Sequence, residues 1–216
     1  MKKLYIIIPK FNGEKEIKDC LASLQLIKVP KGWEIGIVVV DNIEMQNAKF
    51  KMQNENLKLK IIKNKKNLGF AGGVNVGIRY ALKNGAESVL LLNQDTVVEK
   101  DFLLPLLKNS ADIVGSVIKF RRKGRWVYDY GGRVEWWIGK NTHWEIRNSK
   151  FSRLPAGPRQ RRWQIRNKSK INRGRLGRWP EGIPPKWKEK EIDYISGCAM
   201  MIKRRVFERI GLFDER

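Results

Sequence analysis

Two polar side chains follow a buried-type apolar run in the stretch VLLLNQDT, residues 89–96. Asn93 and Asp95 are alternate residues, so in an extended chain their side chains point to the same side. A carboxylate beside an amide suits a hard divalent cation that keeps most of its waters and takes further ligands from a diphosphate. A carboxylate at a strand end is also an ordinary turn residue. The pattern alone leaves both interpretations open.

A second candidate is the glycine-rich stretch NLGFAGGVNVG, residues 67–77. Its spacing fits neither the GxGxxG dinucleotide pattern nor the Walker pattern. In one interpretation, Gly73 and Gly77 let a helix pack closely on a sheet. In the other, small residues let the backbone lie against a ligand whose negative charge faces the N-terminus of that helix.

Asp41 ends the apolar run IVVVD and is a third candidate. Its carboxylate can accept hydrogen bonds from a base N–H or from ribose hydroxyls. It can equally cap the helix that follows.

The elements that must position these residues alternate along the first half of the chain. Apolar runs predict strands, and apolar residues at helical spacing predict helices. Strands that are continuous apolar runs between helices indicate an α/β fold with a mostly parallel sheet flanked by helices on both faces. We predict strands at 4–8, 35–40, 57–62, 88–92 and 112–118, and helices at 14–26, 72–83 and 100–108.

In such sheets, ligands bind at the carboxyl ends of the strands. This rule places residues 9–12, Asp41–Asn42, 67–73 and 93–95 along one edge. Four polar or glycine-rich strand ends on one edge indicate a ligand-binding site.

The second half of the chain has a different sequence pattern. Residues 126–139 predict a β-hairpin around Gly131-Gly132, and residues 147–190 predict a long basic loop. A strand through Met201 and a short helix ending near Gly211 follow. We expect a single domain, with a nucleotide-binding half at 1–118 and an acceptor-side half at 119–216 that is incomplete at its C-terminus.

The net charge of +23 predicts an anionic partner. Residues 147–190 hold 15 Lys and Arg against two acids, and they include Trp163, Trp179 and Trp187. This segment is a solvated insertion, a contact for an anionic membrane or lipid-linked acceptor, or a surface for single-stranded nucleic acid. Liposome co-sedimentation against oligonucleotide binding, each at two salt concentrations, separates the last two.

The composition argues against several classes of protein and of binding site. One histidine and two distant cysteines argue against a disulfide framework or a Cys/His zinc site, and Cys20 and Cys198 are interpreted as buried small apolar residues. No apolar run approaches the ~20 residues that cross a bilayer. We expect a cytoplasmic protein, peripheral at most to the inner face of the cell membrane.

Five motifs in order resemble the inverting family 2 glycosyltransferases, most closely their rhamnosyltransferase-like branch. The resemblance spans almost the whole chain apart from the basic segment, and the order and spacing of the motifs make it specific. The motifs are IIIPKFNGEKEIKDCLASL, IVVVDN, NLGFAGGVNVGI, LLLNQDTVVEKDFL and DYISGCAMMIKRRVFERIGLFDER.

The resemblance implies a GT-A nucleotide-sugar-binding fold, Rossmann-like, and a role for each motif. Asp41 would contact the pyrimidine or ribose, and Asp95 would hold Mg²⁺ or Mn²⁺ on the diphosphate, with Asn93 beside it in place of the family's DxD motif. Ser196 and Gly197 would lie beside the donor sugar and acceptor. The residues that would line the nucleotide pocket are Asn67, Gly69, Gly73 and Asn75.

The resemblance also implies metal-dependent transfer of a sugar from a nucleotide-sugar donor, a UDP- or dTDP-sugar, to a glycan or lipid-linked acceptor in polysaccharide or cell-envelope biosynthesis. The family's catalytic base usually follows GLFDE in an acidic pair, whereas this sequence ends at Arg216. We expect the base beyond Arg216, with Asp214 and Glu215 as the candidates within the sequence. His143 is a packing or exposed residue, or a late metal ligand of the kind some GT-A enzymes have.

A basic nucleic-acid-binding module on an α/β scaffold is the rival interpretation. It predicts basic residues along a groove and no use for Asn93 and Asp95.

Overall fold

The computed structural model describes residues 1–42, 52–123, 125–135, 140–147, 163–165 and 193–216. Within these ranges the strands are β1 (Lys2–Lys10), β2 (Trp33–Asp41), β3 (Leu57–Lys63), β4 (Ser88–Leu92), β5 (Thr96–Val98), β6 (Ile113–Gly115), β7 (Ile118–Arg122), β8 (Arg125–Glu135), β9 (Lys140–Arg147), β10 (Trp163–Ile165) and β11 (Ala199–Lys203). The helices are α1 (Glu14–Gln25), α2 (Gly69–Lys83), α3 (Leu103–Lys108) and α4 (Arg204–Ile210).

The main sheet has six strands in the order β3-β2-β1-β4-β11-β6. β1 pairs in parallel with β2 and β4, and β2 pairs in parallel with β3. β11 and β6 add an antiparallel edge. The predicted α/β fold with a mostly parallel sheet is confirmed.

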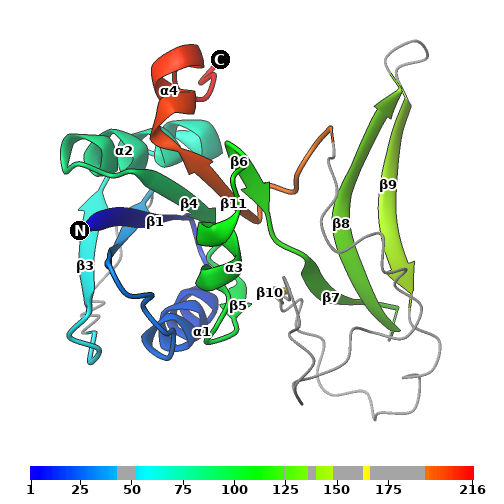
Figure 1. Cartoon of the computed structure of the whole chain (residues 1–216), viewed down its shortest axis with the longest axis horizontal. Helices are drawn as coiled ribbons and strands as arrows, with labels where there is room; N and C mark the ends of the chain where they lie inside the picture. The colour runs from blue at the N-terminus through cyan, green and yellow to red at the C-terminus, as the bar shows by residue number, and fades with distance from the viewer. Residues whose placement is uncertain (43–51, 124, 136–139, 148–162, 166–192) are drawn as a thin grey trace.

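Helices cover both faces of this sheet because its central strands are apolar on both sides (Figure 1). α1 and α3 pack on one face, against residues such as Ile6, Ile8 and Leu90. α2 and α4 pack on the other, against Ile7, Leu91 and their neighbours. Alternate residues of one strand therefore enter different cores.

A second sheet, in the order β5-β10-β7-β8-β9, lies beyond the edge of the first (Figure 1). β8 and β9 form the long antiparallel pair of this sheet. The predicted hairpin is present, but its turn is not at Gly131-Gly132. β8 runs through these glycines, with a register shift between Asp129 and Gly132, so they form a β-bulge.

Three other boundaries differ from the sequence predictions. The strand predicted at 112–118 is two strands, because β6 joins the main sheet and β7 joins the second. α2 begins at Gly69 rather than Gly72. α3 begins at Leu103 rather than residue 100, because the Phe102 N–H bonds the Glu99 carbonyl in a preceding turn.

The second half of the chain returns to the main sheet through β11 and α4, in line with the predicted strand and short helix. The division at residue 118 and the single-domain assignment stay predictions. The basic segment 147–190 lies outside the described residues except for Arg147 and β10. Among the described helices, none is long and apolar enough to cross a bilayer.

The α2–β1 contact yields a stability prediction. A Cβ on Gly77 would lie 2.4 Å from Ile7 Cγ2 and 3.1 Å from Val40 Cγ2, both within the apolar core. We expect Gly77→Ala to lower the free energy of unfolding by about 1–3 kcal/mol, although alanine is the better helix former. Urea unfolding measures this change.

Gly197→Ala is the matched control, because a Cβ there meets no atom within 4 Å. Its free energy of unfolding should stay within about 0.5 kcal/mol of the wild type. A Gly77→Ala variant as stable as this control would contradict the close α2–β1 packing.

Candidate functional site

The carboxyl ends of four parallel strands meet at one edge of the main sheet. β1, β2, β3 and β4 end there at Lys10, Asp41, Lys63 and Leu92, and the antiparallel β11 begins there opposite Leu92. The turns after these strands and the residues before β11 therefore lie along a single rim, next to the second sheet (Figure 1). This is the edge that the sequence predicted as the site.

Asp41 lies inside this edge, in a buried ion pair. Its Oδ1 is 3.3 Å from Lys10 Nζ, and the two side chains are 0% and 4% exposed. The Asn42 N–H bonds the Lys10 carbonyl at 2.9 Å, which fixes the two strand ends together. No sequence pattern singled out Lys10, although it occupies the same position at the end of β1 as Asp41 does at the end of β2.

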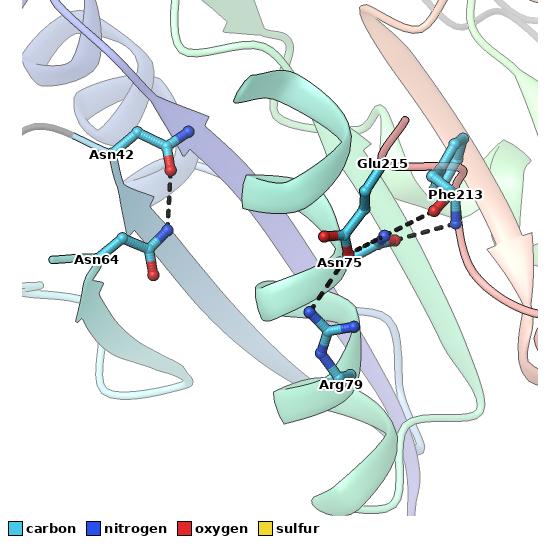
Figure 2. A network of polar contacts seen from close by, with 6 residues as sticks. All are labelled: Asn42, Asn64, Asn75, Arg79, Phe213 and Glu215. Atoms are coloured by element: carbon cyan, nitrogen blue, oxygen red, sulfur yellow. Dashed lines mark hydrogen bonds and ion pairs between the residues drawn. The ribbon is translucent and has the colours of Figure 1, made fainter. Parts of the chain in front are cut away.

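Asn42 connects the end of β2 to the start of α2. Its Oδ1 accepts a hydrogen bond from Asn64 Nδ2 at 2.8 Å (Figure 2), and its Nδ2 donates to the Gly69 carbonyl at 3.1 Å. A Cβ on Gly73 would lie 2.6 Å from Asn42 Nδ2. Glycine at position 73 thus allows the buried amide of Asn42 to reach the helix.

Asn67 and Gly69 shape the turn into α2. The Asn67 Oδ1 accepts the Gly69 N–H at 2.9 Å, and Gly69 has a φ of 68°, in the left-handed region that favours glycine. Both residues are exposed at the edge. The first backbone N–H groups of a 15-residue helix therefore lie at the edge, where they carry the positive end of the helix dipole.

The turn that follows β4, residues 93–95, is called the tip here. Backbone and side-chain hydrogen bonds hold it to its neighbours. The Asn93 N–H donates to the Cys198 carbonyl at 3.0 Å, and the Asn93 carbonyl accepts the Thr96 N–H at 3.2 Å. Gln94 accepts the Phe11 N–H at 3.1 Å and donates to the Asn12 carbonyl. Gln94 thus fixes the tip to the turn after β1, a role that no sequence pattern indicated.

Asp95 is half-buried at the tip, and the nearby thiols of Cys20 and Cys198 are buried. Burial raises the pKa of Cys20 and raises that of Cys198 to about 12, and the negative charge of Asp95 raises both further. The Thr96 Oγ1 lies 3.3 Å from Cys198 Sγ. Both thiols stay protonated at neutral pH, which confirms their interpretation as buried packing residues.

The donor set at this tip fits a cation that a diphosphate helps to bind. Among the described residues, no group of three His, Cys, Asp or Glu side chains could hold a metal ion. One carboxylate, Asp95, with the amide of Asn93 nearby, leaves most ligand positions to water and phosphate oxygens. Mg²⁺ is bound in this way in many phosphate-handling sites.

Ser196 and Gly197 close the edge on the side of the second sheet. The Ser196 Oγ accepts the Cys198 N–H at 3.4 Å, and Gly197 is exposed in a turn. Tyr194 pairs with Gly132 of β8, so this segment passes from the β8 bulge to the tip after β4. His143 pairs with Gly132 through β9, and its side chain lies outside the described residues.

Three predicted residues, Asn75, Asp214 and Glu215, belong to the contact between α2 and the segment after α4. Asn75 points to the segment after α4, where it bonds Phe213 and Glu215 (Figure 2). Asp214 is exposed and bonds Arg216, whose guanidinium lowers the pKa of that carboxyl. The turn that follows Asn42, residues 43–51, lies outside the described residues.

The residues that the structure brings to one edge can bind an anionic nucleotide. The N-terminus of α2 attracts phosphate, Asp95 can hold a cation on that phosphate, and Asp41 with Asn42 provides buried polar groups at the adjacent strand end.

Comparison with known proteins identifies the family of this chain. The sequence model of the family described as Glycosyl transferase family 2 matches residues 5–211. The dTDP-rhamnosyl transferase RfbF of Shigella flexneri is 30% identical over 57% of this chain and 41% of its own length. The low-salt glycan biosynthesis hexosyltransferase Agl10 of Haloferax volcanii is 26% identical over 98% of this chain and 56% of its own.

The chain thus spans about half the length of these two relatives. Among solved structures, S. aureus TarS 1–349 in complex with UDP matches with a TM-score of 0.43 and 28% identity. That match covers 53% of this chain and 35% of TarS 1–349.

The buried Lys10–Asp41 pair yields a prediction. Asp41→Asn removes the negative charge and leaves the Lys10 ammonium buried without its counter-ion. We expect the free energy of unfolding to fall by about 3 kcal/mol or more. Adding Lys10→Met to that variant should recover part of the loss. Urea unfolding of the two variants measures both effects.

The exposed pair Lys58–Glu34, at 2.6 Å, provides the control. Glu34→Gln should cost less than about 1 kcal/mol, because water replaces the lost interaction. If Asp41→Asn cost no more than Glu34→Gln, the buried pair would not contribute to the edge as described.

Proposed function

Since this chain belongs to glycosyl transferase family 2, we propose that it transfers a sugar from a nucleotide diphosphate donor to a glycan or lipid-linked acceptor. The donor is a UDP- or dTDP-sugar, and the anomeric carbon is inverted. The observation that carries the proposal is the meeting of Asp41, the α2 N-terminus and the Asn93–Asp95 tip at one sheet edge.

In this proposal each group at the edge has one task. The N-terminal turn of α2 receives the diphosphate, and Asp41 with Asn42 lies at the nucleoside end. Asp95 would hold Mg²⁺ or Mn²⁺, with Asn93 beside it. The metal, when bound, neutralises the charge that develops on the leaving diphosphate.

Inverting transfer is a single displacement. The acceptor hydroxyl oxygen forms a bond to the anomeric carbon as the bond from that carbon to the diphosphate breaks, and the hydroxyl proton passes to a carboxylate base on the opposite face. The half-buried tip supports this chemistry because Gln94 and the Cys198 carbonyl hold it in one position. Pre-organised groups stabilise developing charge without reorganising during the reaction.

Other parts of the proposal rest on the relatives. RfbF is a dTDP-rhamnosyl transferase and Agl10 is a hexosyltransferase, which supports a hexose donor. The cytoplasmic location, and the contact of residues 147–190 with an anionic membrane, stay predictions from the sequence. Family membership supports the transferase over the nucleic-acid-binding module, which has no use for Asn93 and Asp95.

The metal assignment is tested by calorimetry of UDP and dTDP binding with and without Mn²⁺. We expect Mn²⁺ to strengthen binding to the wild type, and Asp95→Asn to weaken binding in Mn²⁺ by about tenfold or more, because a charged ligand is lost.

Asp101→Asn is the matched control, since Asp101 is exposed and pairs only at the surface with Lys28. It should bind nucleotide as the wild type does. An Asp95→Asn variant with unchanged affinity and unchanged Mn²⁺ dependence would show that the metal is not held by Asp95.

A further inference from the structure

Asn75 uses its side-chain amide to hold the segment after α4. Its side chain is 1% exposed. Nδ2 donates to the Phe213 carbonyl at 2.8 Å and to Glu215 Oε1 at 2.7 Å, and Oδ1 accepts the Phe213 N–H at 3.0 Å (Figure 2). The amide thus pairs with the Phe213 backbone in both directions, as a neighbouring peptide unit would. Both N–H donors of Asn75 are used within the protein.

Glu215 is fixed on the same helix by a second contact. Its Oε1 also lies 3.5 Å from Arg79 Nη2, one turn along α2 from Asn75. Its Oε2 is 3.6 Å from the position that a Cβ on Gly72 would occupy. The Glu215 side chain is 47% exposed, so this carboxylate lies against the first turns of α2 and still faces solvent.

Apolar packing supports the same segment. Leu212 and Phe213 are half-buried and pack against the core that α2 and α4 share with the sheet. Asp214, between Phe213 and Glu215, is exposed and bonds Arg216. Of the two adjacent carboxylates, only Glu215 is therefore held against α2.

The start of α2 contacts the proposed donor site on its other side. Gly73 touches the amide of Asn42, and Asn42 bonds the Gly69 carbonyl. Gly72 and Gly73 are neighbours, so one turn of the helix contacts the nucleotide edge through Gly73 and the Glu215 carboxylate through Gly72. The segment at 212–216 thus contacts the same helical turn that contacts Asn42.

We propose that Asn75 is a positioning residue of the transfer site and not a nucleotide ligand. It fixes residues 213–215 along the start of α2, so that the Glu215 carboxylate lies near the carboxyl edge and accepts a hydrogen bond from a sugar hydroxyl of the donor or acceptor. The role of Glu215 rests on the proposed function, whereas the contact of Asn75 with Phe213 does not.

Native-state hydrogen exchange with nucleotide calorimetry tests the assignment. In Asn75→Ala, the Phe213 amide should exchange about tenfold faster than in the wild type, because its acceptor is lost. The dissociation constant for UDP or dTDP should stay within about twofold of the wild-type value. Asn84→Ala, at the C-cap of the same helix, is the matched control: among the described residues, the Asn84 side chain bonds only the local Tyr80 carbonyl. It should leave Phe213 exchange unchanged.

Asn75→Asp and Glu215→Gln keep the test valid if Asn75→Ala fails to fold. Asn75→Asp retains an acceptor for the Phe213 N–H but places a second carboxylate beside Glu215. We expect faster exchange at Phe213 at neutral pH in this variant. Adding Glu215→Gln should slow that exchange again, because the glutamine amide can donate to Asp at position 75.

The transfer assay separates a positioning role from a purely structural one. Asn75→Ala and Glu215→Gln should each lower kcat by a similar factor. The double variant should lower kcat little further, because both changes remove the action of the same group, the Glu215 carboxylate. Loss of nucleotide affinity with unchanged Phe213 exchange would overturn the assignment. Faster Phe213 exchange with unchanged kcat would overturn it as well.

The failure of the proposed function has a different signature. If the wild-type chain bound neither a nucleotide diphosphate nor a sugar donor, the proposed sugar-transfer function would be wrong. The exchange measurement at Phe213 would still report on the Asn75 contact.

Discussion

The pairing of β1 with β2 on one side and β4 on the other determines which side chains can meet at the carboxyl edge. Both pairings are parallel, so the chain must cross a face of the sheet between strands, and all the polar strand ends emerge together. The strands are buried on both faces by the two helix layers. Burial holds the register, because a slip of one residue would exchange the contents of the two cores.

Helix α2 transmits this constraint to the site. Gly77 lets it lie directly on Ile7, and Gly73 lets it accept the side chain of Asn42. The helix start is then fixed relative to Asp41 by a chain of hydrogen bonds rather than by apolar contact alone. On its opposite side, Asn75 joins the helix to the segment after α4. One helix thus contacts both the proposed donor site and the segment after α4.

Much of the fold followed from local sequence, and most of the contacts did not. Continuous apolar runs predicted the parallel sheet, because only strands buried on both faces read in that way. Periodicity contains no information about register, so the pairing of Lys10 with Asp41 was not visible. Gly131-Gly132 looked like a hairpin turn, whereas the structure uses the pair as a bulge, with the Asp129 carboxylate accepting the Gly131 N–H. Asn75 meets residues more than 130 positions away, a contact that no local pattern predicts.

We propose that the nucleotide diphosphate binds at this edge, between the N-terminus of α2 and Asp95. A crystal structure of the chain with UDP or dTDP and Mg²⁺ tests it most directly. We expect Mg²⁺ at about 2.1 Å from an oxygen of Asp95, with the diphosphate on that ion and next to the Gly69 turn. An ordered diphosphate bound away from this edge, or at the edge with its metal held by residues other than Asp95, would contradict it.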